Sequence, residues 1–505
     1  MKRTFSVILA LTLSAASLCS QTKKLTAYPD MMVQLKKLDA ASGRVSLETI
    51  GRSVQGRDIP ALFFSSNTFA GQRGKKPLAL IFCQQHGDEV SGKEAALLLA
   101  AELLGSEKNI LERLDLILVP TANPDGSELK QRRNANNRDL NRNHVLLSEP
   151  ETLALHRLFQ RWFPEIVLDV HEYGAVSPWW VGQGVIKNVD EMLGSLSNLN
   201  TDAGIRAFSQ EVFYPAVRER VEKDGYILFP YMVGSPDEHD RLRFSTNDID
   251  DGRQGFGIYG TLAFILEGKR YGGMDNMLER RSATQLSAMT AFLRTVAERG
   301  GEIMNLVRTA RTGLLQEVAA DERAFVRMDY FPDPARPSIA FPVFNLAEWK
   351  AETREWKNFA PLVKIKKSVP LPFAYIIPAT ETALIELLQR HQMRLFRLTA
   401  PAAATVERYQ VLHVAGRIEE EISKPELDLE KTSEKTGLHA GDVVVFLNQP
   451  ARRLIPLLLE PESSWGILTD TGEVPAAFGA YMREGGVYPV MRLMEKIELP
   501  LEEIE

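Results

Sequence analysis

The chain is 505 residues long, with 44% hydrophobic residues, 25% charged residues and a formal net charge of −6. A chain of this length can bury a large core and is expected to form more than one domain. No block of basic residues stands out, so the composition gives no indication of a nucleic-acid partner.

The N-terminal segment 1–20 has the three parts of a secretory signal peptide. Basic residues precede the apolar run 5–13, and small residues then lead to Ser20. This order predicts export to the periplasm or the extracellular space. A lipid anchor at Cys19 is an alternative, although Leu18 is a poor match to the small residue that such a signal requires. The apolar run is too short for a permanent span. No later run is long enough either, so we expect no integral membrane segment after signal removal.

Strand and helix patterns alternate over the first 310 residues. The strands are expected at 45–50, 61–65, 78–82, 114–119, 166–170 and 262–266, and the helices at 30–41, 94–104, 149–162, 201–221 and 276–299. Such alternation predicts an α/β fold in which a mixed central sheet is flanked by helices. Cys83 ends one of these strands and is the one cysteine left after signal removal, so we interpret it as a buried thiol without a disulfide partner.

The pattern changes after about residue 310. Residues 311–410 combine proline-rich pieces with a strand at 373–377 and a helix at 379–392. Residues 411–505 consist mostly of short apolar runs and turns. Together these patterns predict a main domain over 21–310, an α/β connecting region over 311–410 and a smaller β-rich C-terminal accessory domain over 411–505.

Side chains that can bind a metal follow three of the predicted strands. His86 and Glu89 lie in the turn after 78–82, His171 follows another strand, and Glu267 follows a third. In an open α/β sheet, ligands bind at the carboxyl ends of the strands. A catalytic zinc takes three protein ligands from histidines and carboxylates and keeps a position for water. Two histidines and a glutamate meet that count, although His-x-x-Glu in a turn is by itself a weak signal.

Six pieces of the sequence, in order between Met32 and Arg299, resemble the zinc metallocarboxypeptidases of the M14 family, the carboxypeptidase A-like enzymes. They are Gly-x-Ser-x-x-Gly-Arg at 51–57, His-Gly-Asp-Glu at 86–89, Asn-Pro-Asp-Gly at 123–126, Asp-Leu-Asn-Arg-Asn at 139–143, Asp-Val-His at 169–171 and Phe-Ile-Leu-Glu at 264–267. Together these pieces are far more specific than any one of them. The resemblance implies that residues 21–310 form a zinc carboxypeptidase-like catalytic domain.

The resemblance also implies a metal site. By it, His86, Glu89 and His171 are the ligands of one Zn²⁺ per chain. Asp139 matches the acidic residue that accepts a hydrogen bond from the first ligand histidine, which would set the tautomer and orientation of its ring.

The substrate-binding and catalytic residues are implied in the same way. Asn141 and Arg142 match the pair that binds the terminal carboxylate of a substrate, a task suited to the planar guanidinium. Arg132 matches the arginine that stabilises the oxyanion, with the neighbouring Arg133 as an alternative assignment. Glu267 matches the general base.

These roles imply an exported zinc metallopeptidase that hydrolyses the C-terminal peptide bond of peptides by zinc-activated water, with Glu267 as general base. Cell-wall peptides are among the candidate substrates, and the expected partner is a peptide with a free C-terminal carboxylate. Two alternatives stay open. One is a zinc deacylase of N-acyl amino acids, whose substrates also carry a free carboxylate. The other is a catalytically inactive peptide-binding homologue, against which the retained Glu267 argues.

The sequence departs from the family before the proposed base. No tyrosine lies between Tyr231 and Tyr259, where the family often has one on a flexible loop, and Ser245 stands in that region. We assign neither tyrosine to the site. The residue that selects the substrate side chain is expected within 247–257, where Asp250, Asp251 and Arg253 point to opposite preferences. The pair Trp179-Trp180 is a candidate for the cleft or for the core.

Overall fold

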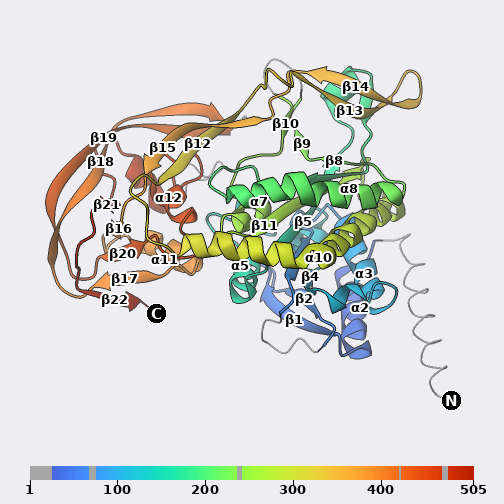
Figure 1. Ribbon diagram of the computed structural model, residues 1–505, viewed down its shortest axis with the longest axis horizontal. Helices are drawn as coiled ribbons and strands as arrows, with labels where there is room; N and C mark the ends of the chain where they lie inside the picture. Colours follow the sequence, from blue (N-terminus) through green and yellow to red (C-terminus); the bar gives the residue numbers. More distant parts are fainter. Residues whose placement is uncertain (1–24, 68–74, 236–240, 420–421, 469–475, 505) are drawn as a thin grey trace.

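The computed structural model describes residues 25–67, 75–235, 241–419, 422–468 and 476–504. The long helix α10 (Leu278–Leu314) runs from the larger N-terminal part toward the C-terminal sheet (Figure 1). The expected signal peptide, including Cys19, lies outside the described residues. Within the described ranges, no helix combines the length and the apolar character that a membrane crossing requires.

A mixed sheet of eight strands forms the centre of the larger part, in the order β1-β2-β4-β3-β5-β11-β7-β8. The strands are β1 (Val45–Arg52), β2 (Asp58–Phe64), β3 (Leu78–Cys83), β4 (Asp115–Val119), β5 (Ile166–Gly174), β7 (Glu191–Gly194), β8 (Leu228–Pro230) and β11 (Leu262–Arg270). Neighbours β4, β3, β5 and β11 run parallel, so their carboxyl ends lie at one edge of the sheet. Every residue of β3 is buried, as expected for a parallel strand that is covered on both faces.

Helices flank this sheet, which confirms the predicted fold class. They are α2 (Tyr28–Ala41), α3 (Ser91–Leu104), α4 (Pro124–Leu129), α5 (Pro150–Trp162), α6 (Pro178–Gly182), α7 (Ala203–Phe208), α8 (Tyr214–Lys223) and α9 (Gly252–Gly257). Helices α3 and α8 pack against α10, and α7, α8 and α10 lie in front of β5 and β11 in Figure 1. Helix α5 packs on β1, and α9 packs on β5 and β11.

One predicted helix is divided. The sequence pattern predicts a single helix over 201–221, whereas the structure has α7, a π-helical turn at Ser209–Phe213 and then α8. Pro215 stands at the beginning of α8. Proline has no backbone N–H to donate, so a regular helix is interrupted before it and the local hydrogen bonding is rearranged.

The predicted β-rich C-terminal region is confirmed as an antiparallel sheet of seven strands, in the order β19-β18-β21-β16-β20-β17-β22. The strands are β16 (Ala374–Ile377), β17 (Leu395–Leu398), β18 (Ala402–Glu419), β19 (Ile422–Leu438), β20 (Val443–Phe446), β21 (Met491–Leu493) and β22 (Leu501–Ile504). Helices α11 (Thr382–Arg390) and α12 (Leu454–Leu459) accompany it. Its core is continuous with that of the larger part, because one cluster of buried residues includes both Tyr259 and Leu384.

The segment between α10 and this sheet contains strands that the sequence pattern did not reveal. Strands β12 (Arg323–Phe331) and β15 (Leu362–Pro370) pair with each other. The hairpin of β13 (Ser338–Asn345) and β14 (Lys350–Lys357) extends a sheet with β6 (Val185–Lys187) of the larger part. Charged residues stand along much of β14 and β15. Apolar alternation, the signal used to find strands, is therefore weak there.

Candidate active site

Three turns that are distant in the sequence interlock at the edge of the central sheet. A Cβ atom on Gly87 would lie 2.0 Å from the carbonyl carbon of Gly126, so the two turns meet at their backbones. Asp125 accepts hydrogen bonds from Ser53 Oγ at 2.7 Å and from Gln55 N at 2.8 Å. A side chain at Gly87 would push the two turns apart, whereas one at Gly126 would collide with Asn123 and the backbone of Arg133. The three motifs therefore form one support for the site.

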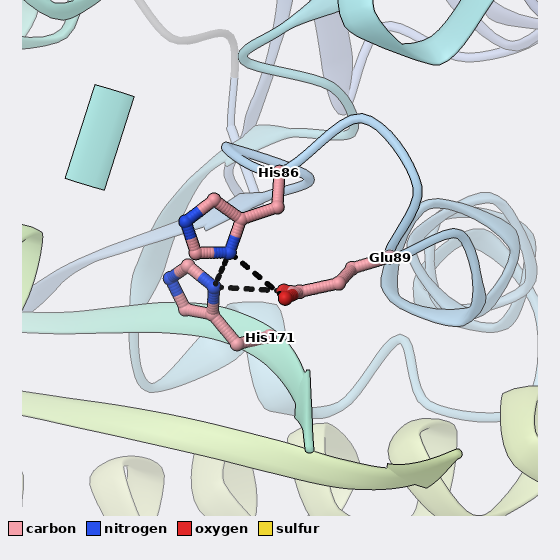
Figure 2. A group of neighbouring side chains, drawn as sticks. All are labelled: His86, Glu89 and His171. Atoms are coloured by element: carbon pink, nitrogen blue, oxygen red, sulfur yellow. Dashed lines mark hydrogen bonds and ion pairs between the residues drawn. The ribbon is translucent and has the colours of Figure 1, made fainter. Parts of the chain in front are cut away.

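His86, Glu89 and His171 converge on one point (Figure 2). His86 Nδ1 lies 2.8 Å from Glu89 Oε1, His171 Nδ1 lies 2.9 Å from Glu89 Oε2, and the two nitrogens are 3.1 Å apart. Donor atoms around a tetrahedral zinc, with bonds of about 2.0–2.1 Å, lie about 3.3 Å apart. The three side chains therefore fit a zinc ion with small adjustments. No other group of His, Cys, Asp or Glu within the described ranges is arranged to hold a metal.

The charges of these side chains match that use. Burial would raise the pKa of Glu89, but His86 and His171 hold it well below its usual value, so the carboxylate is ionised. Burial would lower the pKa of His171, but Asp169 and Glu89 raise it well above its usual value. The site stabilises positive charge on His171, and for the same electrostatic reason it stabilises a bound metal cation.

A carboxylate lies behind each ligand histidine. Asp139 Oδ1 is 3.1 Å from His86 Nε2, and Asp169 Oδ1 is 2.8 Å from His171 Nε2. A carboxylate at this position favours a proton on Nε2 and leaves the Nδ1 lone pair for the metal. Asp169 was not among the site residues expected from the sequence. Its position two residues before His171 places both side chains on one face of β5, and that spacing is the signal that was missed.

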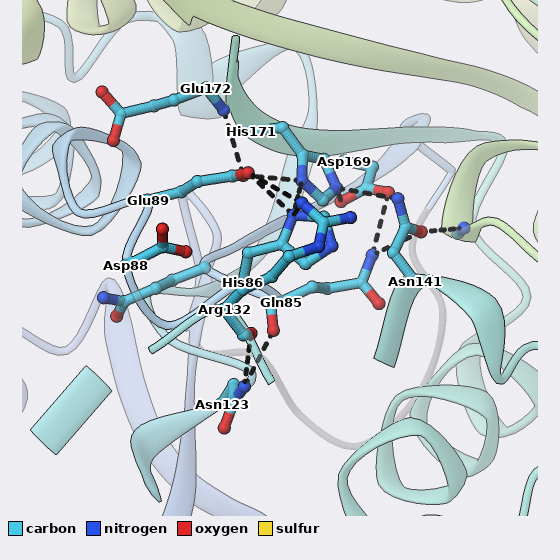
Figure 3. A network of polar contacts seen from close by, with 12 residues as sticks. Gln85, His86, Asp88, Glu89, Asn123, Arg132, Asn141, Asp169, His171 and Glu172 are labelled. Atoms are coloured by element: carbon cyan, nitrogen blue, oxygen red, sulfur yellow. Dashed lines mark hydrogen bonds and ion pairs between the residues drawn. The ribbon is translucent and has the colours of Figure 1, made fainter. Parts of the chain in front are cut away.

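The structure separates the two arginines between which the sequence left a choice. Arg132 Nη1 lies 3.1 Å from His86 Nδ1 and 3.4 Å from Glu89 Oε1 (Figure 3). Its Nε donates a hydrogen bond to Asp139 Oδ2 at 2.9 Å. Arg133 instead donates to the carbonyl oxygen of Asn137 at 2.9 Å, at the protein surface. Only Arg132, of this pair, presents its guanidinium to the cluster of ligand atoms.

Asn141 lies directly beside the metal ligands. Its Oδ1 accepts hydrogen bonds from Gly252 N at 2.7 Å and from Gln85 Nε2 at 3.1 Å. Its Nδ2 lies 3.3 Å from His171 Nε2. The carboxamide oxygen is thus engaged within the protein, and the carboxamide nitrogen is the group of this side chain that can turn to a substrate.

Arg142 follows Asn141 and is surrounded by acidic groups. Its Nη1 donates to the carbonyl oxygen of Asn141 at 2.7 Å. Burial would lower the pKa of Arg142, but Asp250 and Asp248 raise it, so the guanidinium is permanently charged. The two aspartates reduce the net positive charge that a bound carboxylate would meet.

Arg253 and Asp251, two of the candidates for substrate selection, pair with each other. Arg253 Nη2 lies 2.7 Å from Asp251 Oδ2, and Arg253 also bonds the hydroxyl of Ser245 and, at 3.3 Å, the carbonyl oxygen of Ser195. The Arg253 side chain is fully buried. These contacts fasten the 245–254 segment to the end of β7, and they explain why the sequence offered opposite charge preferences in this region.

Glu267 stands beside the metal ligands because of the strand register. It pairs with His171 across the parallel strands β11 and β5. Both residues lie inside their strands rather than after them, because the pairing continues to Arg270. The pKa of Glu267 is raised to about 7, because burial and the nearby Glu89 raise it more than His171 and His86 lower it.

Tyr231 approaches the proposed base, which the sequence did not predict. Its hydroxyl donates a hydrogen bond to the Glu267 carboxylate. The residue follows β8 directly, and no local motif marks it. The hydroxyl of Tyr259 instead lies 3.2 Å from His391 Nδ1, in the core.

A cavity of about 580 Å³ borders Tyr231. The walls include residues from β7, the α7 region and Ser245, together with 361–363 from the segment after α10. Parts of the chain that are far apart in the sequence therefore line the same cavity. The C-terminal half therefore contributes to the surroundings of Tyr231.

Helix α10 supports the ligand end of β5. Arg281 donates from Nε and Nη2 to the carboxylate of Glu172, at 2.7 and 2.8 Å. Gln285 Nε2 donates to the carbonyl oxygen of His171 at 2.6 Å. These groups are buried, so water cannot replace their hydrogen bonds. The position of His171 therefore depends on a helix that lies more than a hundred residues later in the sequence.

Other candidates from the sequence serve packing. Trp180 is buried against Phe341 and Trp356, and Trp179 contacts Trp356. Cys83 is a buried free thiol whose pKa is raised by burial, as interpreted from the sequence.

Comparison with known proteins shows a family similarity over the N-terminal part of the chain. Residues 31–193 match the family model described as zinc carboxypeptidase. The matched segment contains His86, Glu89 and His171, whose donor atoms meet in the structure. Over residues 31–193 the chain is similar to the M14 zinc carboxypeptidases. This carboxypeptidase therefore carries zinc carboxypeptidase activity, with the three converging side chains as its zinc site.

The similarity extends beyond the matched segment. Carboxypeptidase 2 of Trichophyton tonsurans is 25% identical over 454 residues, which cover 88% of this chain and 81% of the relative. Carboxypeptidase D of Drosophila melanogaster is 34% identical over 157 residues, which cover 25% of this chain and 11% of the relative. Among solved structures, carboxypeptidase A from Helicoverpa armigera matches with a TM-score of 0.41 and 16% identity, covering 56% of this chain and 76% of that one.

Proposed function

We propose that this carboxypeptidase removes C-terminal residues from peptides, with Glu267 as general base. The observation that carries the proposal is the register between Glu267 and His171, which places a buried carboxyl group beside the zinc ligands. Burial raises the pKa of that group to about 7, near the value at which a base works best at neutral pH.

The protein side chains then have separate tasks. Zinc held by His86, Glu89 and His171 would polarise the scissile carbonyl and acidify a water molecule. Glu267 takes the proton of the attacking water and passes it to the leaving amine. Arg132 lies next to the ligand atoms, and from there its guanidinium donates hydrogen bonds to the oxyanion that develops.

Arg142 and Asn141 provide the site for the chain end. A guanidinium forms two parallel hydrogen bonds to a carboxylate, which fixes direction as well as distance. The Asn141 carboxamide nitrogen adds a third donor next to the zinc ligand His171. Holding the terminal carboxylate here places the last peptide bond, rather than an internal one, at the metal.

A deacylase of N-acyl amino acids is the second candidate, because its substrates present the same terminal carboxylate. A product assay separates the two. Purified protein is given a peptide with a free C-terminus, the same peptide with an amidated C-terminus, and an N-acyl amino acid. We expect release of single residues from the free peptide and almost none from the amidated one. Faster cleavage of the N-acyl amino acid than of any peptide in the panel would favour the deacylase.

We also propose that the mature protein acts outside the cytoplasm. The support is the basic, apolar and small-residue order of residues 1–20. Cell-wall peptides would then be accessible substrates. N-terminal sequencing of the protein recovered from the exported fraction tests this, with a start near residue 21 expected. An intact N-terminus in the cytoplasm would contradict it.

A further inference from the structure

A chain of buried polar side chains leads away from the zinc ligand His171. Asp169 Oδ1 lies 2.8 Å from His171 Nε2, and Asp169 Oδ2 accepts a hydrogen bond from Gln85 Nε2 at 2.9 Å (Figure 3). Gln85 Oε1 lies 2.8 Å from His144 Nε2, and His144 Nδ1 lies 3.0 Å from His156 Nε2. The chain joins β5, the turn before Glu89, the segment after Arg142 and helix α5.

The chemistry of these groups determines which one donates and which one accepts in each hydrogen bond of the chain of side chains. An amide oxygen only accepts, so His144 must carry its proton on Nε2 to bond Gln85 Oε1. A neutral His144 then has a bare Nδ1, which accepts from the N–H of His156. If the Gln85 amide turned over, its oxygen would face the Asp169 carboxylate and its N–H₂ would face the N–H of His144. The Asp169 carboxylate only accepts, so the Gln85 amide keeps its N–H₂ toward Asp169, and the N–H of His144 holds the amide oxygen on the other side.

All four groups are withdrawn from water. Asp169, Gln85 and His156 are 0% exposed and His144 is 1% exposed. Burial lowers the pKa of His144 to about 4 and that of His156 well below its usual value, so both rings are neutral near neutral pH. Without water to replace it, a lost hydrogen bond in this chain leaves a buried polar group unpaired.

We propose that Gln85 and His144 are positioning residues for the zinc site. They act through Asp169, whose orientation sets the proton on His171 Nε2 and therefore directs Nδ1 at the metal. The inference rests on zinc binding by His86, Glu89 and His171, and it adds residues that touch neither the metal nor the substrate. The outer partners of ligand histidines typically change metal affinity by 10- to 100-fold when they are removed.

Another buried histidine, His391, packs against His156 and provides a matched control. The His391 ring lies 5.7 Å from that of His156 and is 2% exposed. Its Nε2 donates to the carbonyl oxygen of Val145 at 2.7 Å, and its Nδ1 lies 3.2 Å from the Tyr259 hydroxyl. His391 is therefore buried and packs against His156, but it has no hydrogen bond to Gln85.

The test measures the zinc dissociation constant by competition with a chromophoric chelator, without substrate. The proteins are the wild type, His144→Phe, His144→Gln and His391→Phe. We expect His144→Phe to bind zinc about 10- to 100-fold more weakly. His144→Gln keeps a donor toward Gln85 Oε1 and should bind nearly as well as the wild type. His391→Phe should stay within about twofold, because it lies outside the chain of bonds that ends at Asp169.

The visible spectrum of the cobalt-substituted protein gives a second readout, because it reports the arrangement of the ligands and not the stability of the fold. It should change in His144→Phe and not in His391→Phe.

Equal zinc binding by His144→Phe and the wild type would overturn the proposal, as would an equal loss in His391→Phe. If His144→Phe does not fold, Gln85→Met breaks the same link and must show the same loss. A wild type that binds no zinc would overturn the metal site itself, whereas tight binding insensitive to residues 85 and 144 overturns this inference alone.

Discussion

The hydroxyl of Tyr231 is hydrogen-bonded to the carboxylate of Glu267, the proposed general base. Burial raises the pKa of Glu267, and this hydrogen bond opposes the rise because it stabilises the ionised form. Tyr231 therefore helps to keep the base available at neutral pH. Bound zinc adds positive charge nearby and acts in the same direction.

Tyr231→Phe should move the acidic limb of the kcat/KM profile to higher pH. The base must be ionised to accept a proton, so a higher pKa of Glu267 removes activity first on the acidic side. A profile of kcat/KM against pH measures the shift, and we expect a loss of at least a few-fold near pH 6. Tyr259→Phe is the control, since that hydroxyl contacts His391 in the core. Superimposable limbs in Tyr231→Phe and the wild type would show that this hydrogen bond does not tune the base.

Arg132→Met should lower kcat by about 10²- to 10³-fold, the cost of losing one donor to a developing oxyanion. Arg133→Met is the matched control, because the neighbouring guanidinium faces the surface and bonds Asn137. Steady-state kinetics with one peptide compare the two variants. A large loss in Arg133→Met with little effect in Arg132→Met would reverse the assignment.

Arg142→Lys should weaken recognition of the substrate carboxylate, because an ammonium group does not form the paired hydrogen bonds of a guanidinium. The loss of one charge-assisted bond, about 1.5–3 kcal/mol, corresponds to roughly 10- to 100-fold. The quantity to measure is the ratio of kcat/KM for a free peptide to that for its amidated form. The ratio should fall in the variant, mainly through KM. An unchanged ratio would place the carboxylate site elsewhere.

The buried pair of Arg281 and Glu172 should be important for stability. Arg281→Met leaves the Glu172 carboxylate unpaired and buried, at a cost of about 3–5 kcal/mol in the free energy of unfolding. Replacing both residues, Arg281→Met with Glu172→Leu, removes that charge and should recover part of the loss. Urea unfolding measures the free energy of unfolding of the wild type, the two single variants and the double variant, which together form a double-mutant cycle. Additive losses would mean that the two side chains do not depend on each other.

Much of the site was predictable from the sequence. His86 and Glu89 follow a short apolar strand, whereas His171 and Glu267 directly follow apolar runs within strands that continue beyond them. Local patterns mark such residues as candidates, because each stands next to an apolar run, and the resemblance to a family assigns their roles. The same holds for the fold class, which follows from the alternation of strand and helix patterns.

The residues that surround the ligands were not predictable in this way. Tyr231, Gln85 and His144 reach their partners only after strands and loops from distant parts of the chain have packed together. None of them stands at a spacing that marks a role. Strands β14 and β15 were missed for a different reason, since charged residues along them hide the alternation that marks a half-buried strand.

Peptide hydrolysis by Glu267→Gln tests the central claim most directly, provided that zinc is quantified in the same preparation. Glutamine has the size of glutamate but does not accept the proton of the attacking water at neutral pH. We predict about one zinc per chain, as in the wild type, with kcat lower by about 10²- to 10⁴-fold. A variant that holds its zinc and hydrolyses the free peptide at the rate of the wild type would contradict the assignment of Glu267 as the base.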